Sequence, residues 1–239
     1  MMSDTLGPNP GESLRPILRH EARTAMTVLG LVEGPLWYAA AFIFVVGALW
    51  RIGGMLALPA RVELSEPRAS AVAGAVRSIL QHSLPRPAFV RRTAFHVIAG
   101  YLFHLGLFAL LLFGAPHVAF IKEQLLGFGW NPMPRWAFIV TAEVAFLGLM
   151  LLWLRRLLDP VMGKISDAHD HAGSWLTLLV MLTGCFALQE ADESLRILHM
   201  LSVEAWLVYF PFSRLMHAVF FLFSRGYTGA AYGRRGVAL

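Results

Sequence analysis

Cysteine and charged residues are scarce in this chain of 239 residues. It contains one cysteine, Cys185, and only 15% of its residues are Asp, Glu, Lys or Arg. A single cysteine excludes a disulfide framework and any zinc or iron–sulfur centre held by several cysteines of this chain. The sequence also has no Gly-rich nucleotide-binding loop and no nucleophile–base motif, which argues against a terminal catalytic centre.

Apolar residues are abundant instead. Hydrophobic residues make up 57% of the sequence and the mean hydropathy is +0.60, more than the core of a water-soluble domain of this length needs. The net charge of +5 comes from arginines between the apolar runs rather than from a basic patch interleaved with aromatic residues. The charge therefore indicates membrane topology, and no nucleic-acid partner is expected.

Apolar segments of about 20 residues predict an all-α, polytopic membrane protein with a bundle of five transmembrane helices. The predicted spans cover residues 36–58, 93–115, 136–154, 174–189 and 199–224. They divide the chain into a polar N-terminal extension (1–33), a membrane domain (34–226) and a tail (227–239). Residues 15–32, with Arg19 and Arg23 on one side, are expected to form an amphipathic surface helix or an ordered tail without a role.

The distribution of arginine predicts the orientation of the chain. The connection after the first span, the connection after the third span and the C-terminal tail are rich in arginine, whereas the other two connections are poorer. The positive-inside rule places the basic segments and the C-terminus in the cytoplasm and the N-terminus outside. We expect a multi-pass protein of the cytoplasmic (inner) membrane of a prokaryote. Its long basic connection, residues 60–90, suits a docking surface for a partner.

Histidines on two of the predicted spans indicate the chemistry. His199 and His217 are eighteen residues apart, which is five turns of an unbroken helix and about 27 Å along its axis. One ring would then lie near each face of a hydrocarbon layer of about 30 Å. The second span runs in the opposite direction and carries His96 and His104, with His117 beyond its end. Histidines at matched depths on two spans favour axial ligation of two stacked haems over zinc or copper, because no Cys, Asp or Glu accompanies them at metal-ligand spacing.

Several segments resemble the cytochrome b (gamma) subunit of respiratory nitrate reductases. They are FPFSRLMH at 210–217 preceded by RILH at 196–199, AAAFIFVVGALWR at 39–51, LFHLG at 102–106 and LLWLRRLLDP at 151–160. Related membrane subunits occur in the complex associated with dissimilatory sulfite reductase and in heterodisulfide-reductase-like complexes. The resemblance implies a five-span subunit with two haems b, quinone or quinol as mobile substrate, and a cytoplasmic iron–sulfur partner subunit.

The same resemblance implies a set of haem ligands. The LFHLG match makes His104 the second-span ligand of the inner haem, paired with His217. The family has its other second-span ligand ten residues further on, where this chain has Gly114. His117 is the nearest substitute at the right depth and would pair with His199.

Two alternatives remain open for the second span. His104 and His117 lie about 140° apart on an ideal helix, so the use of both requires a kink near Pro116. His96 could pair with His217 instead, because its direction differs from that of His117 by only about 60°. His96 and His104 could also serve together as the two second-span ligands.

Three further residues are candidates for the site. Arg214 is a natural partner for a haem propionate, or else it extends its charge to the membrane surface. Glu204 could take a proton from quinol, or hydrogen-bond a neighbouring helix. Lys122 could border a quinone pocket, or be solvated. His169, in a predicted cytoplasmic connection, is expected to be a surface residue.

The sequence thus predicts an electron-transfer subunit rather than an enzyme with its own catalytic centre. It would exchange electrons between the quinone pool and an iron–sulfur partner. The polar N-terminal extension, the long first cytoplasmic connection and Gly114 distinguish it from the nitrate-reductase type and favour the sulfur or heterodisulfide branch. The alternative is a haem-poor or haem-free membrane anchor or assembly subunit of such a complex.

Overall fold

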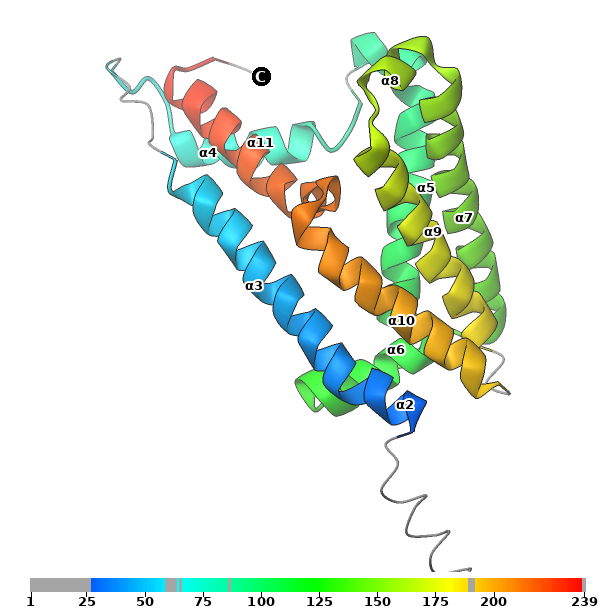
Figure 1. The fold of residues 1–239 in the computed structure, drawn as a ribbon. Helices are drawn as coiled ribbons and strands as arrows, with labels where there is room; N and C mark the ends of the chain where they lie inside the picture. The colour runs from blue at the N-terminus through cyan, green and yellow to red at the C-terminus, as the bar shows by residue number, and fades with distance from the viewer. Residues whose placement is uncertain (1–26, 59–63, 65, 86, 189–191, 238–239) are drawn as a thin grey trace, which may run out of the picture.

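The computed structural model describes residues 27–58, 64, 66–85, 87–188 and 192–237, and all regular structure in this part of the chain is helical. Four of the described helical segments are long and apolar enough to cross a membrane: 28–56, 87–113, 135–158 and 193–212. The chain is therefore a multi-pass membrane protein. The start of the first segment and the end of the last helix lie at opposite ends of the bundle (Figure 1). Most of the predicted surface helix at 15–32 lies outside the described residues.

The first span begins earlier than predicted. It consists of α2 (Val28–Leu31), a π-helical turn (Val32–Leu36) and α3 (Trp37–Leu56), which follow one another without a gap. The Thr27 hydroxyl accepts a hydrogen bond from the backbone N–H of Gly30 at 3.1 Å and so caps the helix start. Pro35 lies within the π-helical turn, where the wider winding accommodates a residue that has no N–H to donate.

A tightly packed helix pair forms the core of the bundle. α5 (Val90–Phe113) follows a short 3₁₀ turn (Pro87–Phe89) and packs along α7 (Arg135–Leu158). Small residues allow the close approach: Gly148 of α7 lies against the backbone of Ala99 and Phe103, and Gly106 of α5 lies against Ala145. Phe103 and Ala145 also belong to the buried hydrophobic cluster of the protein.

The predicted fourth span is helical but begins with polar residues. α7 is followed by α8 (Pro160–Ile165) and α9 (Ala168–Ala187). α9 starts with the sequence AHDHAGS, and it is not among the four segments whose length and composition suit a membrane crossing. The prediction of five spans is therefore wrong by this criterion, because the polar first turns of α9 lower its apolar content.

The predicted span at 199–224 is not one helix. α10 (Glu193–Tyr209) is followed by two 3₁₀ turns (Phe210–Phe212 and Arg214–Met216) and then by α11 (His217–Arg234). Pro211 has no N–H for a helical hydrogen bond, and Ser213 is extended, with φ −116° and ψ 178°. The Ser213 hydroxyl then accepts from the backbone N–H of Leu215 at 3.1 Å, which starts the next turn. α11 continues to Arg234, so most of the predicted tail from 227 is helical.

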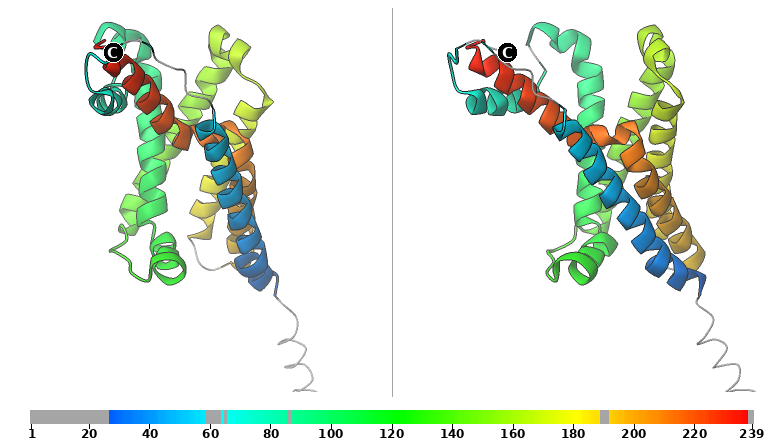
Figure 2. Two further views of the ribbon diagram at one scale, coloured as in Figure 1. Left: turned by 90° about the vertical axis from the view of Figure 1, so that its left-hand side faces the viewer. Right: turned by 60° about the vertical axis from the view of Figure 1, so that its left-hand side comes forward.

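α11 pairs with α4 (Ala71–Gln81) at one end of the molecule (Figures 1 and 2). Gly74 of α4 lies against Gly229 and Gly233 of α11, and Ser78 lies against Gly229. The side chain of Ser78 is only 2% exposed. At the other end, α6 (Ala115–Phe120) and a π-helical turn (Ile121–Leu126) follow α5. α10 runs between α3 and α9 and packs on both.

The packing of α5 on α7 can be tested with a pair of glycine variants. A Cβ atom added at Gly148 would lie 2.8 Å from the backbone oxygen of Ala99, and backbone atoms cannot move aside easily. We expect Gly148→Ala to lower the free energy of unfolding by about 1–3 kcal/mol. Gly53→Ala on α3 is the control, since nothing lies within 4 Å of the added atom, and it should stabilise the helix by roughly 0.5–1 kcal/mol. Thermal denaturation in detergent measures both, and equal stability of the two variants would contradict this packing.

Candidate functional site

The structure brings His104 and His217 together. Their ring centroids are 5.9 Å apart and the ring planes are nearly perpendicular, at 88°. His104 lies in the middle of α5, and its Nδ1 donates to the backbone oxygen of Gly100 at 2.7 Å. His217 is the first residue of α11, and its Nδ1 donates to the backbone oxygen of Arg214 at 2.8 Å. These carbonyl oxygens can only accept, so both Nδ1 atoms carry the proton.

A second pair is formed by His117 and His199. Their ring centroids are 6.3 Å apart, with an interplanar angle of 35°. The Nδ1 of His117 donates to the backbone oxygen of Leu110 at 2.9 Å. The Nδ1 of His199 lies 3.1 Å from the hydroxyl of Thr183 on α9. That hydroxyl directs its own proton to the carbonyl oxygen of Leu179 at 2.9 Å, so it accepts from His199.

A helix break turns His117 toward His199. α5 ends at Phe113, and Gly114 adopts extended backbone angles, φ −63° and ψ 133°. Pro116 then occupies the first turn of α6, where its missing N–H costs nothing. The kink required for both His104 and His117 to face the last span is therefore present, at Gly114 rather than at Pro116 itself.

The four rings share one arrangement that suits metal ligation. Each Nδ1 is occupied by a hydrogen bond, which leaves the unprotonated Nε2 as the available ligand atom, as is usual for metal-bound histidines. Metal–imidazole bonds are about 2.0–2.1 Å long and the nitrogen lies about 1.1 Å from the ring centroid, so two axial imidazoles on one metal have centroids about 6.2 Å apart. The measured separations of 5.9 and 6.3 Å fit this value.

Each pair offers two protein ligands and no third. Among the described residues there is no cluster of three or more His, Cys, Asp or Glu side chains that could hold a metal ion. A zinc site needs three or four protein ligands, whereas a haem iron takes four nitrogens from its macrocycle and two from the protein. The donor set therefore fits haem better than a bare ion. His96 is not a member of either pair, so the geometry favours His104 as the partner of His217.

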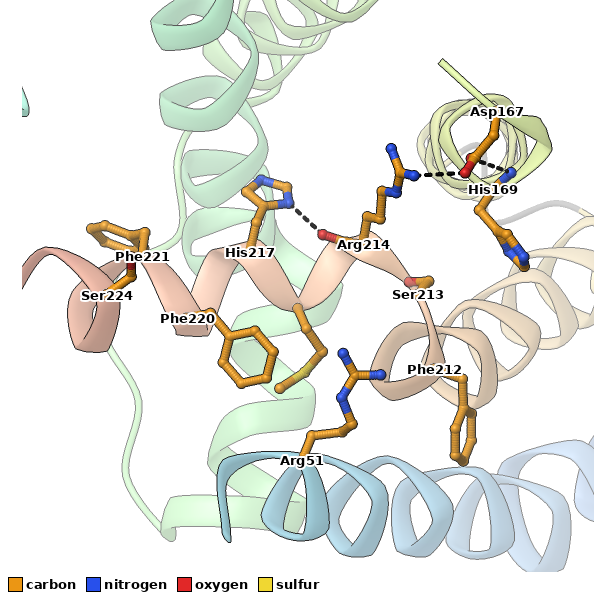
Figure 3. A pocket seen from close by; sticks show the side chains of 11 residues that line it. Arg51, Asp167, His169, Phe212, Ser213, Arg214, His217, Phe220, Phe221 and Ser224 are labelled. Atoms are coloured by element: carbon orange, nitrogen blue, oxygen red, sulfur yellow. Dashed lines mark hydrogen bonds and ion pairs between the residues drawn. The ribbon is translucent and has the colours of Figure 1, made fainter. Parts of the chain in front are cut away.

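A cavity of about 660 Å³ adjoins His217 and lies within the size range of small-molecule sites, roughly 300–1,000 Å³. It is an open cavity bordered by α3, the start of α9, the segment between α10 and α11, and the first turns of α11 (Figure 3). Its lining includes two guanidinium groups, Arg51 and Arg214, and His169. His169, predicted to be a surface residue, is exposed, and it also borders the same cavity as His217.

Arg214 is held by two carboxylates at the start of α9. Its Nη2 donates to Asp167 at 2.6 Å and its Nη1 to Asp170 at 2.5 Å. The side chain of Asp170 is only 7% exposed and also meets Arg156 of α7, at 3.2 Å. Burial tends to raise the pKa of Asp167, but the backbone N–H of Asp170 and the Arg214 guanidinium outweigh this and hold that pKa below its ordinary value. The ion pair between Arg214 and Asp167 therefore persists into mildly acidic conditions.

Glu204 lies away from the His117–His199 pair. Pro211 packs against Gly47 of α3, and α10 and α3 run in the same direction (Figure 1). Two turns earlier on the two helices come Glu204 and Ala40, which are 4% and 3% exposed. Glu204 therefore faces α3, and neither of its carboxyl oxygens has a hydrogen-bond partner among the described residues.

Lys122, on the turn after α6, is exposed, and its side chain packs against Gly129.

Sequence reasoning missed Thr183, Gly184 and Arg51. Thr183 orients His199, and a Cβ atom at Gly184 would lie 3.0 Å from the His199 ring, so a small residue is needed there. Neither has a sequence signal beyond its position on the apolar face of α9. Arg51 did have a signal, because it is the only charged residue of α3, and a charge within an apolar span is a functional candidate.

The fold and the paired histidines define a multi-pass helical membrane protein with two facing histidine pairs. The chain is 30% identical over 219 residues to a protein of Nitratidesulfovibrio vulgaris, covering 87% of this chain and 95% of that protein. It belongs to the same family as that protein, whose name, "Protein", states no function. No family model matches the chain, and no solved structure matches it.

The carboxyl group of Glu204 is buried and has no hydrogen-bond partner among the described residues. An unpartnered buried polar group costs about 1–3 kcal/mol, so Glu204→Met, which has a similar shape, should raise the free energy of unfolding by about 1 kcal/mol. Glu66→Met in the connection before α4 is the control, because Glu66 is exposed outside the membrane spans and its replacement should show no gain. Thermal denaturation of both variants decides the matter, and clear destabilisation by Glu204→Met would mean that Glu204 has a partner.

Proposed function

We propose that this chain is the di-haem b membrane subunit of a respiratory redox complex. It exchanges electrons between the quinone pool and a cytoplasmic iron–sulfur partner subunit. The proposal rests on the two histidine pairs. In each pair the ring centroids are about as far apart as those of two imidazoles that are axial ligands of one iron, and both Nδ1 atoms are already hydrogen-bonded. The sequence segments that resemble nitrate reductase gamma subunits support the same function.

His104 and His217 would hold one haem, and His117 and His199 the other. A haem iron with two histidine ligands accepts and returns single electrons without binding substrate. The protein's own contribution is to fix the four rings: three backbone carbonyls and the Thr183 hydroxyl determine which nitrogen is free and where it points. His104 lies in the middle of α5, and the His117 ring is held at the Leu110 carbonyl. Leu110 is six residues, or about 9 Å, further along the helix axis, so the two sites lie at different depths of a hydrocarbon layer of about 30 Å.

His217 is the first residue of α11, and α11 extends from it toward the end of the molecule that carries α4 (Figure 1). By the positive-inside rule we assign this end to the cytoplasm, where the partner subunit would dock on the basic connection between the first two spans. Quinol would then meet the protein near the His117–His199 pair, on the outer side. The polar N-terminal extension of the sequence, the long basic connection and Gly114 favour a complex of the sulfur or heterodisulfide branch, in the inner membrane of a prokaryote.

A visible spectrum with a haem count tests the proposal. The purified protein should contain two haems b per chain, with reduced α and Soret bands. Replacement by Ala of any one of the four paired histidines should remove about one haem, because one ligand of a bis-histidine site is lost. His96→Ala is the matched control on the same helix and should keep both. A protein without haem would instead be a membrane anchor, and loss of haem in the His96 variant would reassign the second-span ligand.

If quinol is oxidised near the His117–His199 pair, its protons are released on the outer side of the membrane. In liposomes that contain quinol, with an electron acceptor on the cytoplasmic face, turnover should acidify the outer compartment. Electrons that cross toward the cytoplasm work against an inside-negative potential, at about 2.3 kcal/mol per charge for each 100 mV. An imposed opposing potential should therefore slow turnover. Proton release on the cytoplasmic side would place the quinol site beside His217 instead.

A further inference from the structure

Two arginines line the cavity beside His217, and they differ in one respect. Arg214 has both terminal nitrogens bound to carboxylates, Asp167 and Asp170. Its guanidinium points away from α3 toward the start of α9 (Figure 3). A side chain committed in this way has little capacity left for another anion, so it is a poor candidate for the haem propionate partner that the sequence analysis assigned to it.

Arg51 has no carboxylate partner among the described residues. Its guanidinium lies 5.6 Å from the centroid of the Phe220 ring, a cation–π contact that orients the group without neutralising it. Figure 3 shows it rising from α3 into the cavity between Phe220 and Phe212. Arg51 is half-buried and is the only charged residue of α3. A cation in this setting is stabilised by an anion in the cavity.

The charges around the cavity leave a surplus of one cation. The two carboxylates at the start of α9 bind Arg214, and Asp170 is shared with Arg156. Arg51 approaches from α3, across the cavity from the start of α9, and His217 at the start of α11 lines the same cavity (Figure 3). An anionic group that reaches from His217 toward α3 would therefore meet Arg51 first.

We propose that Arg51 binds a carboxylate of the group held at His217, namely a propionate of the inner haem. This inference rests on the proposed function and replaces Arg214 with Arg51 as the anion-binding residue. Arg214 has a different role as a positioning residue: its side chain fixes the segment whose backbone oxygen accepts from His217. The shared chemistry, an anion at a guanidinium, could also come from a lipid phosphate, because Arg51 lies five residues before the end of α3.

The test uses the midpoint potential of the inner haem. His199→Ala removes the outer site, so the full-length variant in lipid nanodiscs should hold one haem, at His217. In this background Arg51→Gln should lower the midpoint potential, because a nearby cation stabilises the reduced and more negative state. The potential should also become dependent on pH near neutrality, because the propionate loses the charge that keeps it ionised. Arg51→Lys should restore most of both effects, and Lys164→Gln on α8 is the control that changes neither.

Each other outcome contradicts a different part of the inference. An unchanged potential in the Arg51→Gln variant would overturn the assignment while leaving the haem ligands intact. A change that appears only in nanodiscs with anionic lipid, and not in those of phosphatidylcholine alone, would identify lipid phosphate as the anion. Loss of the haem from both Arg51→Gln and Arg51→Lys would make Arg51 a structural residue. Absence of haem from the unaltered protein would refute the proposed function, and the Arg51 assignment with it.

Discussion

The ion pairs between Arg214 and the start of α9 hold the chain at the point where the last apolar segment stops being a helix. Pro211 and Ser213 end α10, and without a second anchor the following residues could continue in many directions. Asp167 and Asp170 fix Arg214, and the Arg214 carbonyl in turn fixes the His217 ring. Because Asp170 is nearly buried and shared with Arg156, removal of one member would leave an uncompensated charge. The geometry of the His104–His217 pair thus depends on charges outside it.

Both histidine pairs follow one plan. Each combines a histidine in the middle of a long helix, His104 or His199, with one that follows a helix break, His217 or His117. A mid-helix ring has a direction fixed by helical phase, and the ring after a break is free to turn toward it. The closely packed helix pairs are α5 with α7, α10 with α9 and α3, and α4 with α11. Each histidine pair therefore joins segments outside these close pairings, where a group can lie between the rings.

The sequence was a good guide to which histidines meet and a poor guide to how they meet. The antiparallel spans predicted His96 and His104 at the depth of His217, and His117 at the depth of His199, with the second-span ligands left open. The structure pairs His104 with His217 and His117 with His199. The prediction assumed one unbroken helix from His199 to His217, which Pro211 and Ser213 interrupt. Arg214 was visible as a charge, but its partners are 44 and 47 residues away in the chain. Contacts at such separations depend on tertiary packing, which helical periodicity does not encode.

The two histidine pairs differ in their electrostatic surroundings. The outer pair is oriented by the Leu110 carbonyl and the Thr183 hydroxyl, which carry no net charge. The inner pair adjoins a cavity whose wall includes Arg51, a cation without a carboxylate partner among the described residues. A positive charge stabilises whichever state of a neighbouring group holds the extra electron, and it does so more strongly where water is excluded. On the proposed function, an electron is therefore held more favourably at the inner pair, and the asymmetry of charge directs it from the outer side toward the cytoplasmic partner.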